Sequence, residues 1–321
     1  MRGMLHKKMS SVLLLLLLSC ILISGCSGGS KELPEEFSGK KETKAHSGTP
    51  RDNTPKILAP EASGSVVFEN GTVSIDASHT ESGYFMVRYT GTNDKVKLRV
   101  TGPDQSEYVY LLSARGEYET FPLPCGSGSY QAQVLEHTGN DMYAVAYSAD
   151  ISASIQDEFS PFLCPNQYVN FSAESLTVAK GSELVKDTYS DLEAIERIYR
   201  FVTGEISYDE EKAASVAYGY LPVVDDTLKS KKGICFDYAA LMGAMLRSQG
   251  IPTKLEVGYS GDAYHAWISS YTKESGWIDG VIQFDGDTWT LMDPTLAAGN
   301  SASSVKKYIG DGSNYVVKYS Y

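Results

Sequence analysis

The sequence predicts two folded domains behind an N-terminal export segment: an all-β sandwich, followed by an α+β domain. Three observations support this prediction. A short apolar stretch lies close to the N-terminus. Between residues 64 and 156, short runs of β-branched and aromatic residues alternate with turn residues. After residue 190, the apolar residues take up a helical periodicity.

The N-terminus has the features of a secretory signal. Arg2, Lys7 and Lys8 precede an apolar stretch over residues 12–23, which is the order typical of a signal peptide. About a dozen apolar residues are too few for a helix that crosses a bilayer, since such a helix needs about 20. Residues 1–25 are therefore predicted to be a signal peptide rather than a permanent membrane span.

The residues that follow predict a lipid anchor. Ile23-Ser24-Gly25-Cys26 comes directly after the apolar stretch and resembles the lipobox of bacterial lipoproteins, in which the cysteine receives the lipid. The resemblance implies that Cys26 becomes the lipidated N-terminus and that the protein is extracytoplasmic, anchored to the bacterial cell membrane. The alternative is an ordinary signal peptide cleaved nearby, with Cys26 as an unmodified thiol.

The overall charge excludes one class of partner. The formal net charge is −12 at pH 7, and removal of the basic signal peptide makes the remaining chain more acidic still. Nucleic-acid binding needs clustered Lys and Arg side chains that neutralise phosphates. The protein is therefore not expected to bind nucleic acid.

Residues 26–63 are predicted to be a flexible tether. After Cys26 the segment is rich in Lys, Glu, Gly, Ser, Pro and Thr, and Phe37 is its only aromatic residue. Such a composition cannot bury a hydrophobic core. As a random coil, a segment of about 36 residues would hold the folded part on the order of 35 Å from the membrane.

The β-rich region extends over residues 64–156. Its predicted strands cover residues 66–68, 72–75, 84–89, 95–100, 108–112, 130–135 and 144–147. Turn signals at this spacing favour an antiparallel β-sandwich, and Pro122 and Pro124 mark one break between strands. No catalytic constellation appears here, so we interpret the sandwich as a spacer, a packing partner or a binding module.

A connector over residues 157–189 leads to the second domain, residues 190–321. This domain begins with a predicted helix. The apolar residues on one face of that helix are Leu192, Ile195, Ile198, Tyr199 and Val202. Ser190 and Glu193 form a capping-box pair at its start, and Gly204 suits its end.

A second helix is predicted to begin at Cys235, directly after a tight turn at Gly233, and to end before Gly250 and Pro252. Four strands are predicted after it. They cover residues 254–259, 265–271, 281–284 and 289–292. A helix packed against an antiparallel sheet gives an α+β domain.

Three residues of this domain have the properties of a thiol catalytic triad. Cys235 lies at the predicted start of a helix, where the helix dipole favours a thiolate. His265 lies at the head of a strand and is the expected base. Asp293 follows the last of these strands and is the expected acceptor that orients the imidazole. Each residue alone has a simpler structural explanation, so the prediction depends on all three together.

The residues around these positions resemble the motifs of the transglutaminase-like superfamily. The matching segments are Lys232-Gly233-Ile234-Cys235-Phe236-Asp237-Tyr238-Ala239, Tyr264-His265-Ala266-Trp267 and Met292-Asp293-Pro294-Thr295. The order Cys, His, Asp and the spacings of 30 and 28 residues are also similar to those of the family. The resemblance covers about residues 190–298. It implies a papain-like α+β fold with Cys235, His265 and Asp293 as the catalytic residues.

The same resemblance implies an acyl-transfer or hydrolytic thiol enzyme. Members of the family attack a glutamine carboxamide or a peptide bond through a cysteine thioester, and an amine or water then takes the acyl group. No cofactor is expected for this chain. Together with export, this predicts protein or cell-wall peptide amides as substrates. The alternative is a cell-surface binding or scaffold protein with a non-catalytic transglutaminase-like fold.

Four groups are candidates for supporting roles. The backbone N–H of Cys235 is a candidate oxyanion donor, and Tyr218 and Tyr220 are candidates for a second donor, with hydrophobic packing as the alternative role for each tyrosine. Trp267 is a candidate to line and shield the site, with a core position as its alternative.

The remaining cysteines and one acidic turn leave further questions. Cys125 and Cys164 could form a disulfide, or both could stay thiols, and the sequence leaves both alternatives open. Asp285-Gly286-Asp287 is interpreted as a hairpin turn, because it lacks the repeated oxygen-ligand spacing of a calcium loop. No metal site is predicted.

Overall fold

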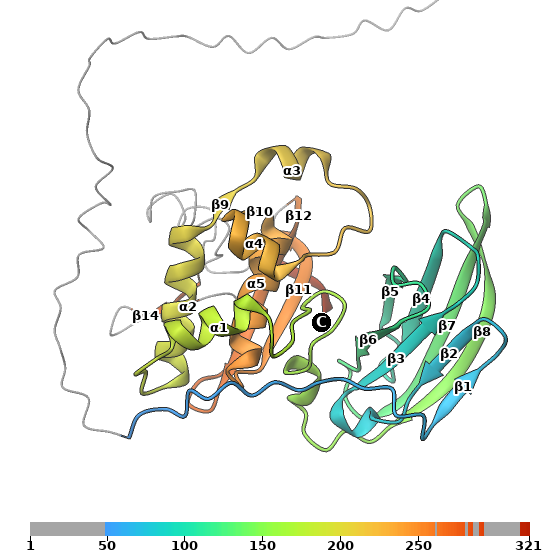
Figure 1. Cartoon of the computed structure of the whole chain (residues 1–321), viewed down its shortest axis with the longest axis horizontal. Helices are drawn as coiled ribbons and strands as arrows, with labels where there is room; N and C mark the ends of the chain where they lie inside the picture. The colour runs from blue at the N-terminus through green and yellow to red at the C-terminus, as the bar shows by residue number, and fades with distance from the viewer. Residues whose placement is uncertain (1–48, 261, 280–281, 285–288, 292–314) are drawn as a thin grey trace, which may run out of the picture. The chain divides into compact units, whose positions relative to one another are not determined.

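The computed structural model describes residues 49–260, 262–279, 282–284, 289–291 and 315–321 (Figure 1). The predicted signal peptide, the predicted lipidation site Cys26 and the predicted triad residue Asp293 lie outside these residues. Gly48–Tyr321 form one compact unit. In the part of the chain that is described, no helix is both long and apolar enough to cross a membrane.

The first folded region consists of two four-stranded antiparallel sheets, which we call the two-sheet region. The first sheet has the order β1-β2-β3-β6 and contains β1 (Val67–Glu69), β2 (Val73–Asp76), β3 (Tyr84–Tyr89) and β6 (Tyr118–Pro122). The second has the order β5-β4-β7-β8 and contains β4 (Val96–Thr101), β5 (Glu107–Leu111), β7 (Gly128–Gly139) and β8 (Met142–Ala153). A short 3-10 helix, η2 (Thr80–Ser82), lies between β2 and β3.

The two sheets contact each other through apolar faces. Burial alternates along β4, where Val96, Leu98 and Val100 are buried, as expected for a strand with one face towards a core. Tyr110 of the second sheet packs edge to face on Phe121 of the first, with ring centroids 4.8 Å apart. A β-sandwich requires such packing, and the assignment of this region as one sandwich stays a prediction.

Two features of the strands differ from the sequence prediction. β6 is a strand where the sequence predicts a break at Pro122. Proline is tolerated because β6 is an edge strand and Pro122 is its last residue. β7 and β8 are each 12 residues long, which exceeds their predicted lengths. They are joined through Asn140 and Asp141, whose positive φ angles are those of a tight type I′ hairpin turn.

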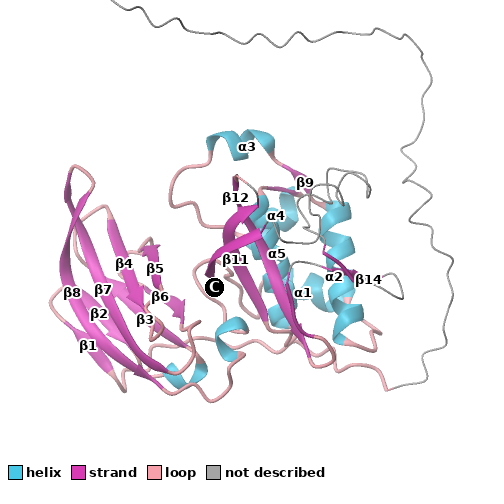
Figure 2. Cartoon of the chain, turned by 180° about the vertical axis from the view of Figure 1, so that it is seen from behind, coloured by secondary structure: helices cyan, strands magenta, loops and turns pink. Residues whose placement is uncertain are grey.

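The second domain contains helices and a mixed set of strands (Figure 2). The helices are α1 (Leu176–Leu184), α2 (Asp191–Glu205), α3 (Glu210–Ser215), α4 (Val224–Ser230) and α5 (Cys235–Ser248). The main sheet has the order β13-β12-β11-β16 and contains β11 (Thr253–Ser260), β12 (Ala263–Thr272), β13 (Gly276–Asp279) and β16 (Tyr315–Ser320). Two strand pairs are β9 (Ser207–Tyr208) with β10 (Lys232–Gly233), and β14 (Ile282–Phe284) with β15 (Trp289–Leu291).

Helix α2 begins where the sequence predicts. The side chain of Ser190 accepts a hydrogen bond from the N–H of Glu193 at 3.1 Å, which is one half of a capping box. The carboxylate of Glu193 accepts from the N–H of Tyr189 at 2.9 Å, one residue earlier than a capping box requires. The helix continues through Gly204 and ends at Glu205, one residue past the predicted end.

Helix α5 is the centre of the second domain. Every residue from Asp237 to Ser248 is buried, and α1, α2, α4, β11 and β12 all contact the helix. α1 approaches so closely that a Cβ added at Gly181 would lie 3.3 Å from the Cβ of Met245. The predicted connector, residues 157–189, therefore contributes a core helix to this domain, and it also contains the 3-10 helix η3 (Ser160–Phe162).

The described end of the predicted tether is not free chain. Arg51 forms an ion pair with Asp191 at 2.6 Å and also donates to the carbonyl of Gln249. The N–H of Lys56 donates to the carbonyl of Ser248 at 2.7 Å. Composition alone cannot reveal this docking. It arises because the last carbonyls of a helix, here α5, have no partners within the helix and accept donors from elsewhere.

Arg247 joins three distant segments inside the domain. Its side chain is fully buried and donates to the carbonyls of Thr253 at 2.9 Å, Cys164 at 2.7 Å and Tyr321 at 2.6 Å. Burial lowers the pKa of Arg247 to about 9. The hydrogen bonds compensate for the burial of the guanidinium group.

Four aromatic side chains, three of them buried and Tyr168 partly buried, form a cluster that we call the buried tyrosine cluster and define as Tyr108, Tyr110, Tyr168 and Tyr321. The ring of Tyr321 lies 5.7 Å from Tyr108, 5.6 Å from Tyr110 and 4.6 Å from Tyr168, between centroids. Burial raises the pKa of all four phenols. The cluster therefore connects β5 of the two-sheet region to the end of the main sheet.

Substitution Arg247→Met should destabilise the protein by about 2–4 kcal/mol, because three buried carbonyls lose their donor while only part of this loss is offset by removal of a buried charge. The free energy of unfolding in urea measures the effect. Arg200→Met is the matched control, since Arg200 is mostly exposed and, among the described residues, forms its ion pair with Glu196 on the surface; its effect should stay within about 0.5 kcal/mol. Equal effects of the two substitutions would contradict this role of Arg247.

Stability should fall as the pH rises above the ordinary phenol pKa of 10.0. The unfolded chain then releases protons that the folded tyrosine cluster retains, and each such proton lowers the unfolding free energy by about 1.4 kcal/mol per pH unit. Arg247 has the opposite effect on the pH dependence of stability, because its pKa is lowered on folding. This single group does not outweigh the four tyrosines. Part of the tyrosine absorbance change should therefore coincide with loss of circular dichroism, and complete tyrosine ionisation in a folded protein would refute the expectation.

Candidate active site

Cys235 is the first residue of α5 and is half-buried at its N-terminus. Ile234 before it is extended, with φ −94° and ψ 176°, so the helix begins abruptly at the cysteine. The sequence predicts a tight turn at Gly233, but the structure gives another reason for glycine. A Cβ at this position would lie 2.6 Å from the Cβ of Asp237. The helix start holds the sulfur at the positive end of the helix dipole.

Asp237 lies two residues into the same helix, and three donors bind its fully buried carboxylate. The N–H of Ile234 donates at 2.8 Å, the Nζ of Lys212 at 2.6 Å and the O–H of Tyr220 at 2.5 Å. We call Asp237, Lys212 and Tyr220 the Asp237 clamp. A buried carboxylate is costly unless it is paired and hydrogen-bonded, and the clamp meets both conditions.

The clamp fastens residues 209–223 to the start of α5. Lys212 lies on α3, and Tyr220 lies between α3 and α4. The N–H of Asp209 adds a hydrogen bond to the carbonyl of Gly233 at 2.9 Å. Sequence reasoning missed this arrangement. An acidic residue in the first turn of a helix is a recognisable capping signal, but no sequence pattern pairs that residue with Lys212.

His265 lies on β12, opposite Gly258 of β11 in the strand register, and is half-buried. Trp267 is two residues further on and therefore on the same face of the strand, with its ring centroid 6.2 Å from that of His265. Trp267 is buried and packs edge-on against Tyr315. It is not among the described lining residues of the pocket, so it occupies the core position that was the alternative in the sequence prediction.

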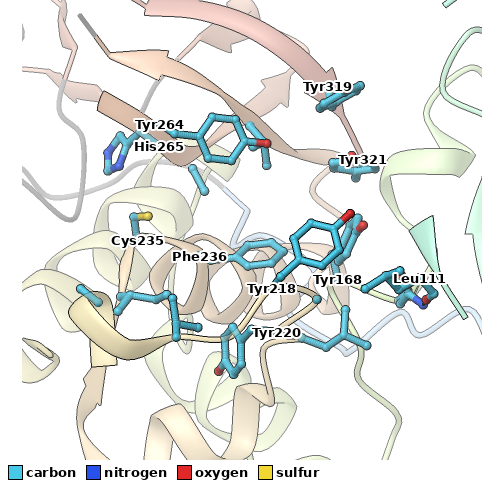
Figure 3. A pocket seen from close by; sticks show the side chains of 18 of the residues that line it. Leu111, Tyr168, Tyr218, Tyr220, Cys235, Phe236, Tyr264, His265, Tyr319 and Tyr321 are labelled. Atoms are coloured by element: carbon cyan, nitrogen blue, oxygen red, sulfur yellow. The ribbon is translucent and has the colours of Figure 1, made fainter. Parts of the chain in front are cut away.

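Cys235 and His265 line the same pocket, which has a volume of 510 Å³. Figure 3 shows the two side chains together at one end of the pocket, with Leu111 at the other end. Its walls come from α5, β12 and β5 and from the segment between α3 and α4. The structure thus brings together two of the three predicted triad residues, and the third, Asp293, lies outside the described residues.

The wall of this pocket is aromatic. Its tyrosines are Tyr168, Tyr208, Tyr218, Tyr220, Tyr264, Tyr319 and Tyr321. Within the described part of the chain, no Lys, Arg, Asp or Glu side chain lines the pocket. Burial raises the pKa of Tyr168 and of Tyr264, so these phenols stay neutral near neutral pH. Sequence reasoning missed most of this wall, because its tyrosines come from segments far apart in the chain.

The two tyrosines predicted as oxyanion donors have different outcomes in the structure. Tyr220 donates its hydroxyl hydrogen to Asp237. The oxyanion role predicted for it is therefore wrong, although its ring lines the pocket. The side chain of Tyr218 lines the pocket and is 83% exposed. The donor role of Tyr218 stays a prediction.

Cys125 and Cys164 are free thiols, so the disulfide alternative is wrong. Cys164 is buried beside Tyr84 and Met86, whereas Cys125 packs against a different group of buried residues in the core. Burial raises the pKa of each thiol to about 12. Both thiols therefore stay protonated and unreactive near neutral pH.

Among the residues that the structure describes, no three His, Cys, Asp or Glu side chains gather closely enough to hold a metal ion. Asp285-Gly286-Asp287, the predicted turn, lies outside those residues. The strands on either side of it, β14 and β15, pair antiparallel.

Comparisons with known proteins point to one family. Residues 179–280 match the family model of the transglutaminase-like superfamily. Kyphoscoliosis peptidase from Mus musculus is 28% identical over 143 residues, which cover 43% of this chain and 21% of that protein. The chain thus spans about a fifth of the length of this curated relative.

Two solved structures are also similar. The periplasmic domain of TgpA from Pseudomonas aeruginosa, bound to ethylmercury, has 17% identity and a TM-score of 0.34, with 75% of this chain and 78% of that chain covered. Red sea bream transglutaminase has 14% identity and a TM-score of 0.27, with coverages of 66% and 48%. The family match includes Cys235 and His265 and ends before Asp293. The chain therefore carries a domain of the transglutaminase-like superfamily.

Proposed function

We propose that this chain is a thiol enzyme that transfers or hydrolyses acyl groups, with Cys235 as the nucleophile and His265 as its base. One observation carries the proposal: a cysteine at a helix N-terminus and a histidine on a neighbouring strand line one pocket. Asp293 is the proposed acceptor for the imidazole, on the strength of its sequence motif. This division of roles is the one that thiol catalysis requires.

The proposed reaction begins with attack of the Cys235 sulfur on a carboxamide or peptide carbonyl carbon. The thiol proton passes to His265, the C–S bond forms, and the tetrahedral intermediate then breaks its C–N bond. The leaving nitrogen takes the proton from the imidazolium, which gives ammonia or an amine and leaves a thioester on Cys235. Water then gives a carboxylic acid, whereas a primary amine gives a new amide, and either route restores the thiol.

The tetrahedral intermediate carries a negative oxygen that needs donors. We propose the N–H of Cys235 as one donor, because the first N–H groups of a helix have no partner within the helix and point outward from its start. The neutral wall of the pocket favours an uncharged substrate group near the sulfur. A carboxamide is such a group, and it is held by hydrogen bonds and packing rather than by charge.

The proposed place of action is the outer face of a bacterial cell membrane, with Cys26 lipidated after removal of residues 1–25. Substrates would then be protein or cell-wall peptide amides. The two-sheet region, as a β-sandwich, would contribute Val109 and Leu111 to the pocket wall. The competing function is a surface binding protein that holds a peptide in this pocket without turnover.

Labelling with a neutral thiol-directed reagent near neutral pH tests the nucleophile. Cys235 should react at least about tenfold faster than an ordinary thiol, and His265→Ala should remove most of that advantage, because the imidazole no longer takes the proton. His137→Ala is the matched control, since His137 lies on β7 beside Tyr143 and not in the pocket. Equally slow labelling of Cys235 in all three proteins would favour the binding function.

Mass spectrometry of a glutamine peptide incubated with the protein tests the reaction itself. Without an amine, we expect ammonia release and conversion of the glutamine to glutamate; with an excess of a primary amine, we expect the corresponding amide. Both products should disappear in Cys235→Ala, because no thioester forms. A reactive Cys235 that yields neither product nor a thioester adduct with any glutamine or peptide-bond substrate would contradict the enzyme proposal.

A further inference from the structure

A second hollow adjoins the pocket of Cys235. It has a volume of 620 Å³, and the two share Leu111, Tyr218 and Gly219 as lining residues. Gly219 has a φ of +84°, and a Cβ there would lie 2.3 Å from the Cδ1 of Leu111. The segment between α3 and α4 therefore packs directly against β5, and Gly219 lies where the two hollows meet.

The position of Leu111 indicates where the second hollow adjoins the first. Figure 3 shows Cys235 and His265 at one end of the first hollow and Leu111 at the opposite end. Because Leu111 belongs to both hollows, the second hollow continues from the end that is distant from the sulfur. An extended chain that enters the first hollow beside Cys235 reaches the second one over Leu111 and Gly219.

The two hollows differ in charge. The first is neutral among the described residues, whereas Lys95, Lys97 and Arg115 line the second, with Asp94 and Asp141 as its acidic members. Arg115 already forms an ion pair with Asp94, at 2.9 Å. Lys95 and Lys97 therefore remain against one carboxylate, that of Asp141. This local excess of positive charge contrasts with the net charge of the chain, which is −12.

Neither lysine is engaged by an acid. Among the described residues, no carboxylate lies within ion-pair distance of the Nζ of Lys95 or of Lys97. The Nζ of Lys97 lies 4.1 Å from the ring centroid of Tyr143 and 6.0 Å from that of Tyr218. These rings hold the ammonium in place through cation–π contact without neutralising it. A held ammonium that lacks a carboxylate is suited to bind one from a ligand.

We propose that the two hollows form one peptide-binding groove. An uncharged residue beside the reacting carboxamide occupies the hollow of Cys235, and a carboxylate side chain further along the peptide binds Lys95 and Lys97. This inference rests on the proposed function, since it takes the carboxamide end of the groove from the role of Cys235. It names the substrate class as peptides that are neutral around the reacting residue and acidic several residues away.

Binding to the full-length Cys235→Ser variant tests the groove without turnover. The probe is a fluorescently labelled peptide of about nine residues, long enough to extend over about 30 Å. It has a central glutamine flanked by leucine and tyrosine, and one glutamate placed in turn at each outer position on either side. The matched probe has glutamine in place of that glutamate. At one or more outer positions, the glutamate peptide should bind about three- to tenfold more tightly at low salt, with the preference lost at high salt.

Lysine substitutions in the same variant locate the effect. Lys95→Gln should reduce the glutamate preference, and Lys95→Gln with Lys97→Gln should abolish it. Lys95 is exposed, so its substitution leaves the fold intact even if removal of Lys97 disturbs the contact with Tyr218. Lys254→Gln is the matched control, because Lys254 also lies over an aromatic ring, 4.0 Å from the centroid of Trp277, but outside both hollows. It should keep the full preference.

The outcomes separate this inference from the proposed enzyme. Equal binding of glutamate and glutamine peptides at every position overturns the groove, and so does a preference that Lys254→Gln weakens as much as Lys95→Gln does. After either result, the proposed enzymatic function is still supported if the thiol of Cys235 is reactive and the expected products form. A third result is possible: the Cys235→Ser variant shows a glutamate preference that depends on Lys95, while Cys235 in the unsubstituted protein is unreactive. That result supports the groove and overturns the proposed enzyme.

Discussion

Burial of helix α5 along its length is the constraint on which the rest of this structure depends. A helix that is apolar on all sides is stable only inside a core, and α1, α2, α4 and the main sheet supply that core. Its ends are the places where polar groups must be satisfied. Asp237 binds the main chain at the start, while Arg51 and the N–H of Lys56 reach the last carbonyls. With both ends held, the position of Cys235 at the pocket follows.

The Asp237 clamp positions a segment of the chain and adds little to the stability of the fold. A buried ion pair adds little net stability, because the cost of desolvating both charges offsets their attraction. What the clamp provides is one arrangement of residues 209–223 relative to α5, and with it the position of Tyr218 and Gly219 in the pocket wall. The clamp also turns the charges of Lys212 and Asp237 towards each other, away from the pocket. The absence of Lys, Arg, Asp and Glu side chains from the described wall of the pocket is partly a consequence of this pairing.

The two-sheet region takes part in the site. The sequence allows three roles for it, as spacer, packing partner or binding module, and the contacts favour the last two. Leu111 of β5 lines the hollow of Cys235 and the adjoining one, and the buried tyrosine cluster connects β5 to the main sheet. In the proposed function, the residues that would recognise a ligand and the residues that would carry the chemistry therefore come from different parts of the chain. Binding and catalysis can be tested separately for this reason.

The sequence by itself determined the features that depend on neighbouring residues: the start of α2 at Ser190, the helix that begins at Cys235 and the strand that carries His265. Capping, periodicity and strand alternation act over a few residues, so they can be recognised without a fold. Only the tertiary structure decided that Lys212 binds Asp237 and that the remaining cysteines stay apart as thiols. It also decided that the described end of the predicted tether donates hydrogen bonds to the last carbonyls of α5. It also showed that Trp267 lies in the core rather than in the pocket wall. Each of these outcomes depends on which distant segments bury one another, and burial is a property of the whole fold that no local pattern contains.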